Sequence, residues 1–208
     1  MSQYSTPIAA KDPSVAKVRT AGAQASLHVS PRDGDLLVSD LRSKRRTYSA
    51  NILGLVVAAL ATDIFEIKGA ADVRVEVGSI TISGVQTTAG QVVAQLIRRS
   101  TANTTGTSTA PAAIKHDAAD AAAAATLKAY TVNPGALGTS AGTVRALRVP
   151  IGVATGAVAP VTLEFGAGGK PIVLASATES LCLNLNGVTV TGGTLDINIE
   201  WTESTVEA

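Results

Sequence analysis

Few residues of this chain have the types and spacing that a chemical site requires. His28 and His116 are the only histidines, and Cys182 is the only cysteine. His116 and Asp117 could form an oriented imidazole, but no serine or cysteine context indicates a triad, so a loop histidine bonded to its neighbour is favoured. Two histidines and one cysteine cannot form a zinc site without carboxylates.

Two other patterns each have a functional and a structural interpretation. Residues 166–170 (GAGGK) suggest a phosphate loop, but the full spacing is missing and Pro171 prevents a helix start, so a β-turn is favoured. Asp196, Glu200 and Glu203 could hold calcium, although a solvated outer strand face is the favoured interpretation. We find no catalytic constellation, and we expect no enzyme activity, no cofactor and no metal.

The first 50 residues differ in composition from the rest of the chain. They carry eight Lys and Arg against four Asp and Glu, a net charge of +4, whereas the remaining residues carry −3. Three prolines interrupt any long helix there, and the apolar periodicity is weak. We expect an extended basic N-terminal arm over residues 1–50, ordered only against a neighbour, and one β-sandwich domain over residues 51–208.

The arm ends in a basic cluster whose members are candidate partner contacts: Arg42, Lys44, Arg45 and Arg46. The plainer interpretation is a solvated run of charge, and the alternative is contact with an acidic partner surface or with nucleic acid. Nucleic acid is not favoured as a partner, because only 16% of the residues are charged and the net charge is +1.

Alternation of apolar and polar residues predicts that the candidate residues discussed above lie on β-strands or on the connections between strands. The alternation begins at Val73 and has the period of a half-buried strand. Gly78 should mark a bulge or bend in that strand. We expect two long antiparallel strands, over residues 73–83 and 92–97, joined by a loop over residues 84–90.

Several other segments have the same alternation, and about eight to ten strands are expected in all. The further strands are expected at residues 62–68, 127–132, 143–149, 161–165, 171–174, 181–185 and 195–201. Cys182 alternates with leucines and should be a buried, inert thiol. Asn186 and Gly187 indicate a tight turn. The pattern predicts an all-β fold, an antiparallel sandwich that is jelly-roll-like.

Three segments are less clear. Residues 49–58 are continuously apolar, which suits a fully buried strand or a short helix. Residues 101–109 are nearly all Ser, Thr, Asn and Gly and should form an exposed loop. The alanine-rich residues 118–125 have helix propensity but no large apolar side chain to bury. A loop leading into a strand is therefore favoured there, with a short helical turn as the alternative.

The composition also bears on assembly and location. The mean hydropathy is positive, +0.28, although few residues are charged. Such a chain should hide more surface than a monomer can, so an oligomer or an assembled particle is expected. No signal segment or membrane-spanning run is found, so synthesis in the cytoplasm is expected.

Several stretches together resemble small β-rich virion proteins of tailed bacteriophages. They are residues 62–69 (TDIFEIKG), 80–90 (ITISGVQTTAG), 98–104 (RRSTANT), 183–193 (LNLNGVTVTGG) and 199–203 (IEWTE). The resemblance covers residues 50–203 and not the arm. It implies a jelly-roll-like sandwich that forms homotrimers and sits on the virion as a cement or decoration protein, with the major capsid protein or another virion protein as its partner. It carries over no functional residues.

Two alternatives remain from the sequence. The first is a head or tail fibre, receptor-binding or adaptor module of the same kind of particle, although 3% aromatic content does not favour glycan stacking. The second is a carbohydrate-active enzyme on a jelly-roll scaffold, which would need paired carboxylates or a histidine cluster in a cleft.

Overall fold

The computed structural model describes residues 15–20, 23–28, 45–156, 158–166 and 170–205. The chain divides into two units, Met1–Lys44 and Arg45–Ala208. In the first unit, β1 (Val15–Thr20) and β2 (Ala23–His28) pair as an antiparallel hairpin. The described part of the arm therefore contains regular backbone pairing, although its side chains lie outside the description.

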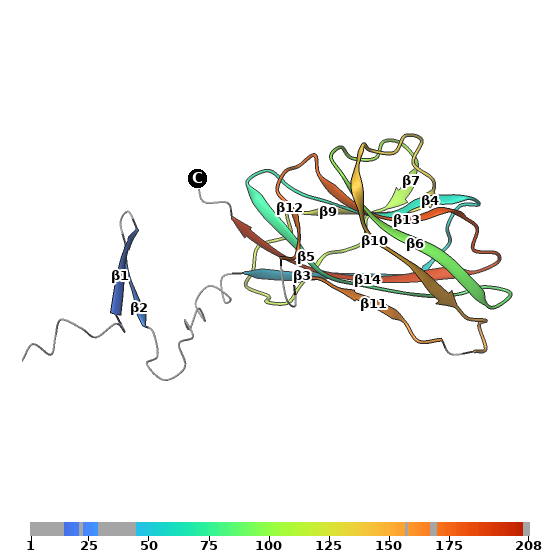
Figure 1. Cartoon of the computed structure of the whole chain (residues 1–208), viewed down its shortest axis with the longest axis horizontal. Coiled ribbons are helices and arrows are strands. Elements are labelled where there is room, and N and C mark those ends of the chain that lie inside the picture. The colour runs from blue at the N-terminus through green and yellow to red at the C-terminus, as the bar shows by residue number, and fades with distance from the viewer. Residues whose placement is uncertain (1–14, 21–22, 29–44, 157, 167–169, 206–208) are drawn as a thin grey trace, which may run out of the picture. The chain divides into compact units, whose positions relative to one another are not determined.

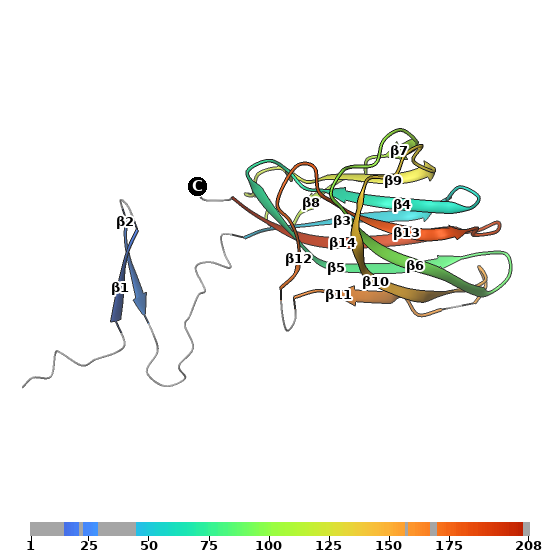
Figure 2. The same cartoon turned by 45° about the horizontal axis from the view of Figure 1, so that its top comes forward.

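The second unit is a sandwich of two antiparallel six-stranded sheets (Figures 1 and 2). The first sheet has the order β11-β5-β14-β3-β8, with β12 also paired to β5, and the second has the order β10-β6-β13-β4-β9-β7. The strands are β3 (Arg46–Leu55), β4 (Ala61–Lys68), β5 (Val73–Val85), β6 (Gly90–Arg99), β7 (Thr107–Thr109), β8 (Ile114–Lys115), β9 (Thr126–Val132), β10 (Ser140–Ile151), β11 (Val161–Glu164), β12 (Ile172–Leu174), β13 (Ser180–Val188) and β14 (Thr194–Thr205). The predicted β-sandwich is confirmed, with more strands than expected because β7 and β8 are too short to show alternation.

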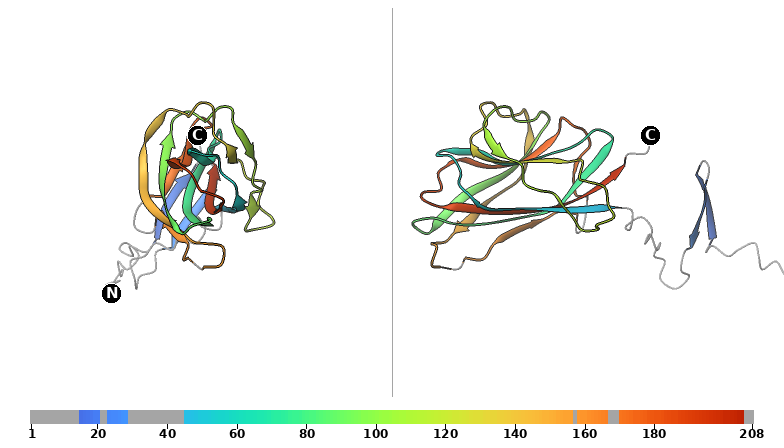
Figure 3. Two further views of the ribbon diagram at one scale, coloured as in Figure 1. Left: turned by 90° about the vertical axis from the view of Figure 1, so that its right-hand side faces the viewer. Right: turned by 180° about the vertical axis from the view of Figure 1, so that it is seen from behind.

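Eight strands of the sandwich follow a jelly-roll order. Strands β11-β5-β14-β3 are consecutive in one sheet, from β11 at its edge, and β10-β6-β13-β4 are consecutive in the other, from β10 at its edge. Most consecutive strands therefore lie in opposite sheets, and the order matches two interleaved Greek keys. Figure 3, left, shows the two layers from the end of the sandwich.

The expected pairing of the two long strands is wrong. Strands β5 and β6 are both present, but β5 pairs with β14 and β6 pairs with β13 and β10. The connection between them crosses from one sheet to the other. Alternation identifies each strand, but it contains no information about which strand becomes its neighbour.

The predicted bulge at Gly78 is confirmed. Glu200 of β14 pairs with Ser79, whereas the next residue, Trp201, pairs with Val77, so Gly78 is the extra residue of β5. The bulge keeps Val77 and Ile80 both in the core, although they are three positions apart. The core is mostly aliphatic, with Tyr48 and Trp201 stacked at 5.6 Å between ring centroids.

The N-terminal boundary of the sandwich lies before the predicted one. Strand β3 begins at Arg46 and pairs with β14, so residues 45–50 belong to the sandwich and not to the arm. The strand interpretation of the apolar run is confirmed, but the strand is only half buried. Leu53 remains 77% exposed on it.

Two further predictions have opposite outcomes. Asn186 and Gly187 both have positive φ, yet they form a bulge inside β13, because Asn184 pairs with Asp63 and Val188 pairs with Ala61 on the same strand. The predicted tight turn there is wrong, since the chain continues in the same direction.

Residues 118–125 form a loop that leads into β9, as favoured. None of the described residues is helical, so none forms a helix that could span a membrane.

Candidate functional site

The predicted basic cluster is only partly within the described residues. Arg42 and Lys44 lie outside them. Arg45 forms an ion pair with Glu76, with 2.9 Å between Nη2 and Oε2, and its side chain is half exposed. Arg46 is the first residue of β3, opposite Glu203 of β14. Arg45 and Arg46 therefore belong to the sandwich. Contact of the basic cluster with a partner stays a prediction.

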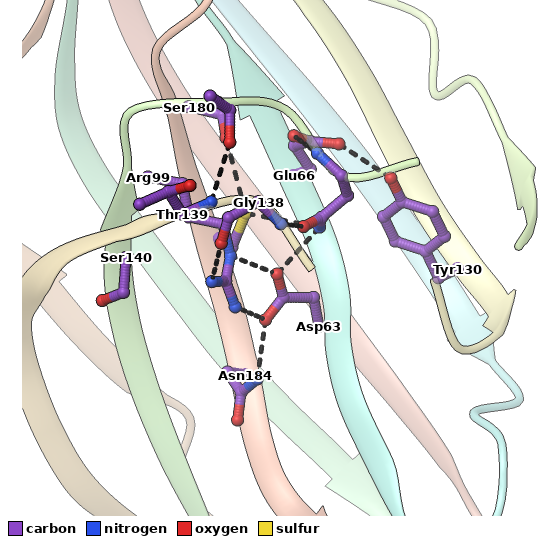
Figure 4. A network of polar contacts seen from close by, with 12 residues as sticks. Asp63, Glu66, Arg99, Tyr130, Gly138, Thr139, Ser140, Ser180 and Asn184 are labelled. Atoms are coloured by element: carbon purple, nitrogen blue, oxygen red, sulfur yellow. Dashed lines mark hydrogen bonds and ion pairs between the residues drawn. The ribbon is translucent and has the colours of Figure 1, made fainter. Parts of the chain in front are cut away.

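The densest polar cluster of the described residues lies on the outer face of the β10-β6-β13-β4-β9-β7 sheet, beneath covering loops (Figure 4). A bulge at Ile64 creates this cluster, because Leu183 pairs with Phe65 while Asn184 pairs with Asp63. Phe65 points into the core, and the extra residue turns Asp63 and Glu66 to the same outer face. Without the bulge, two residues three positions apart would point to opposite faces.

Asp63 is the centre of the cluster and is fully buried. Arg99 donates from Nε and Nη2 to its two carboxylate oxygens at 2.7 and 2.8 Å, and Asn103 and Asn184 donate to it at 2.8 and 2.6 Å. Burial alone would raise the pKa of Asp63. The hydrogen bonds from Arg99, Asn184 and Asn103 outweigh burial and hold the pKa below its ordinary value.

Glu66 is the second buried carboxylate of the cluster. It accepts hydrogen bonds from the Tyr130 hydroxyl at 2.7 Å and from the Asn103 backbone N–H at 3.2 Å. Lys128 lies 3.8 Å away and is partly exposed. Burial, followed by the hydrogen bond to Glu66, raises the pKa of the Tyr130 phenol, so Tyr130 stays a donor at neutral pH.

Cys182 lies in the same layer and is fully buried, as predicted. Asn103 Nδ2 and Ser180 Oγ both lie 3.7 Å from its sulfur. Burial raises the pKa of the thiol, and the charges of Asp63 and Glu66 raise it further. A thiol that remains protonated is a poor nucleophile, so this arrangement does not activate Cys182.

The cluster holds the covering loops on the sheet. Arg99 Nη1 donates to the Gly138 carbonyl at 2.6 Å, and the Gly138 N–H donates to the Asn103 side chain at 2.8 Å. A Cβ at Gly138 would overlap the carbonyl of Thr101, so only glycine allows this approach. Asn103 is 3% exposed, which corrects the expectation that all of residues 101–109 form an exposed loop. Every strong polar group here already has a protein partner, so the cluster works as an internal clamp.

A second clamp holds the alanine-rich segment. Glu203 is 2% exposed and accepts hydrogen bonds from the N–H groups of Ala124 and Ala125 and from the indole of Trp201. The Tyr48 hydroxyl donates to the Ala121 carbonyl at 3.0 Å. Most side chains of residues 118–125 are exposed, and the contacts above hold the segment through its backbone.

The favoured interpretation of Asp196, Glu200 and Glu203 as a solvated strand face holds for Glu200, which is exposed, and is wrong for Glu203, which is 2% exposed. Asp196 accepts a hydrogen bond from the Gly54 N–H at 2.8 Å, Glu200 is exposed, and Glu203 points inward. His116 is exposed, and Asp117 accepts from the Ala119 N–H at 2.9 Å. Among the described residues, no three His, Cys, Asp or Glu side chains are grouped as metal ligands. Part of the predicted 166–170 turn lies outside the described residues.

Two surface pockets complete the candidate sites. One has a volume of about 390 Å³ and is lined by uncharged residues of the β5–β6 and β13–β14 connections. The other, of about 440 Å³, includes Arg74, Arg98 and Lys170. Two of these cations are already paired, Arg74 with Glu76 and Arg98 with Glu179. Neither pocket could be recognised from the sequence, because segments far apart in the chain line both of them.

Comparison with protein-family models, with curated proteins and with solved structures finds no match to this chain. No residue role is therefore transferred from a relative. The function has to be argued from the fold and from the contacts above.

Proposed function

We propose that this chain is a structural protein of a tailed-bacteriophage virion, a cement or decoration protein that binds the major capsid shell. The observation that carries the proposal is the division of the chain into a clamped sandwich and a separate arm unit. A rigid domain covers a fixed area of a shell, and an arm adds contact area when it orders on a neighbour.

The clamps of the sandwich support this interpretation. The buried polar groups of the sheet layer bond to one another and hold the covering loops. Glu203 does the same for the alanine-rich segment. Such networks rigidify a fold, and rigidity suits a protein whose task is mechanical. Jelly rolls also occur in capsid and lectin domains, and this analogy of fold supports the proposal.

The arm is proposed to supply an electrostatic contact. Residues 1–44, the arm as the structure bounds it, carry six Lys and Arg against four Asp and Glu, a net charge of +2, and the rest of the chain carries −1. A basic arm would be attracted to an acidic patch of a neighbouring subunit, and the attraction would weaken at high salt. In this proposal, homotrimers of the chain sit on the shell, and the protein is made in the host cytoplasm.

The first experiment is to band virions from the source strain on a density gradient and to measure their protein content by mass spectrometry. The proposal expects this chain at a fixed ratio to the major shell protein, and electron microscopy should place it on the head. Absence of the chain from banded virions would contradict the proposal. A location on the tail or on fibres would establish the fibre or receptor-binding alternative instead.

The second experiment tests the arm. A chain that lacks residues 1–44 should keep the thermal unfolding of the sandwich but lose most binding to virions stripped of the protein. Full binding by the shortened chain would show that the arm is not a shell contact. Unfolding of the full chain and the shortened chain is compared first, so that a folding defect is not mistaken for lost binding.

A further inference from the structure

At one end of the sandwich, the described connections between strands contain no charged residue. The connections after β3, β5, β10 and β13 all lie there, and Figure 2 shows them together at the right-hand end. We call the described residues of these connections the loop end: residues 56–60, 86–89, 152–156, 158–160 and 189–193. None of these residues is Asp, Glu, Lys, Arg or His. Asp196, at the margin, is bound to the Gly54 N–H.

The loops of this end are fixed to one another. The Leu60 N–H donates to Thr189 Oγ1 at 3.0 Å, and the Thr87 N–H donates to the Thr191 carbonyl at 3.1 Å. The Gln86 N–H donates to the Gly152 carbonyl at 2.8 Å. These bonds join all four connections, so a ligand would meet a surface that is already formed.

The pocket of about 390 Å³ opens between two of these loops, and its volume lies in the range of small-molecule sites. Its polar lining consists of hydroxyl and amide side chains only: Gln86, Thr87, Thr88, Gln91, Thr189 and Thr191. The Thr189 hydroxyl accepts a hydrogen bond from the Leu60 N–H. The other five side chains form no hydrogen bond with any described residue. Five neutral groups that can donate and accept therefore face one pocket.

Exposed aliphatic side chains lie on two other loops of this end. Val56 is 61% exposed, Leu60 is 68% exposed and Val158 is 39% exposed. Leu60 has a φ of 52°, an unusual conformation for leucine, and the bonds of its N–H to Thr189 and of its carbonyl to Asn133 hold it there. The loop end thus combines neutral hydrogen-bonding groups with apolar contact area.

We propose that the loop end binds an uncharged carbohydrate. Hydroxyl groups of a sugar complement the threonines and glutamines of the pocket, and its C–H faces complement the aliphatic residues beside it. A charged sugar or a phosphate would lose water without gaining an opposite charge, so the site should select neutral ligands. An apolar protein surface is the other conceivable occupant. The five unengaged polar groups favour the sugar, because such a surface would leave them without partners.

This inference goes beyond the proposed virion role and does not depend on it. The full chain is first applied to an array of neutral and acidic oligosaccharides, and the best neutral oligosaccharide is then titrated by calorimetry. We expect binding of neutral oligosaccharides only, with an affinity that does not change between low and high salt. Exclusive binding of acidic oligosaccharides, or no binding at millimolar concentration, would overturn the proposal.

Two variants locate the site. Thr191→Val and Gln91→Leu keep the side-chain size and remove one hydrogen-bonding group each, so each should weaken binding about three- to tenfold. Thr126→Val, at an exposed position of β9, is the matched control and should bind as the parent chain does. Unchanged affinity in both pocket variants would overturn the assignment. The alternative, contact between protein chains, has its own outcome. In that case no sugar binds, the molecular mass of the parent chain in solution rises with protein concentration, and Leu60→Asp abolishes this rise.

Discussion

Arg99 and Asp63 form a bidentate ion pair beneath the loops that cover one sheet. The side chain of Arg99 is 4% exposed and that of Asp63 is fully buried, with contacts of 2.7 and 2.8 Å. The two residues come from β6 and β4, which do not pair with each other, because β13 lies between them. The ion pair therefore crosses over β13, and Arg99 also donates a hydrogen bond to the carbonyl of Gly138 in a covering loop.

Removal of the cation should destabilise the sandwich strongly. Arg99→Leu leaves the Asp63 carboxylate buried without its partner, and we expect a loss of about 3–5 kcal/mol in the free energy of unfolding. Arg98→Leu is the control, since Arg98 and Glu179 form a partly exposed pair that contributes about 0–1 kcal/mol. Denaturant unfolding measures both variants. Equal losses would show that the buried pair has no special role.

The same pair predicts acid sensitivity. The pKa of Asp63 in the folded chain lies below its ordinary value of 3.8, so ionised Asp63 stabilises the fold above about pH 4. That stability is lost as the pH falls through the folded-state pKa. The difference in unfolding free energy between the parent chain and Asp63→Asn should be constant from pH 7 to about pH 4 and shrink below it. A difference that shrinks near neutral pH would contradict this assignment.

The single thiol should report unfolding. Cys182 is fully buried, and its raised pKa keeps it protonated. We expect almost no reaction of the folded protein with a thiol reagent at pH 8, and one reacting thiol per chain after denaturation. Absorbance of the released chromophore measures both states. Fast modification of the folded protein would mean that the covering loops open readily.

Glu203 should matter for the alanine-rich segment, and Glu200 should not. Glu203→Gln weakens the bonds to the Ala124 and Ala125 N–H groups, and we expect a loss of about 1–3 kcal/mol. Amide hydrogen exchange of those two residues should become faster. Glu200→Gln lies on the exposed face of the same strand and serves as the control. Similar exchange rates in both variants would exclude the proposed clamp.

Relief of backbone strain at Leu60 should stabilise the chain. Asparagine adopts a positive φ more readily than leucine, and Leu60 is mostly exposed, so its replacement loses little burial. We expect Leu60→Asn to gain about 0.5–1 kcal/mol. Leu53→Asn, at a leucine of β3 that is 77% exposed, should not gain stability. Thermal unfolding compares the two variants, and a gain in both would point to a surface effect unrelated to φ.

The sequence by itself determined the class of fold and the position of most strands. Alternation is a local property of the backbone, because successive side chains leave a strand on opposite faces. It therefore located β5, β13 and β14 and identified Gly78 as a bulge. The lack of large apolar residues in 118–125 was also sufficient to disfavour a helix. Burial of Cys182 followed from the leucines on either side of it.

Only the tertiary structure decided which strands became neighbours and what covered their outer faces. Strands β5 and β6 lie in opposite sheets because each finds its partners far along the chain. Asp63 and Glu66 share a face only because of a bulge at Ile64, and no residue type announces that bulge. The clamp and the loop end both combine segments separated by many residues. Alternation specifies one strand at a time, whereas contacts between distant segments specify a site.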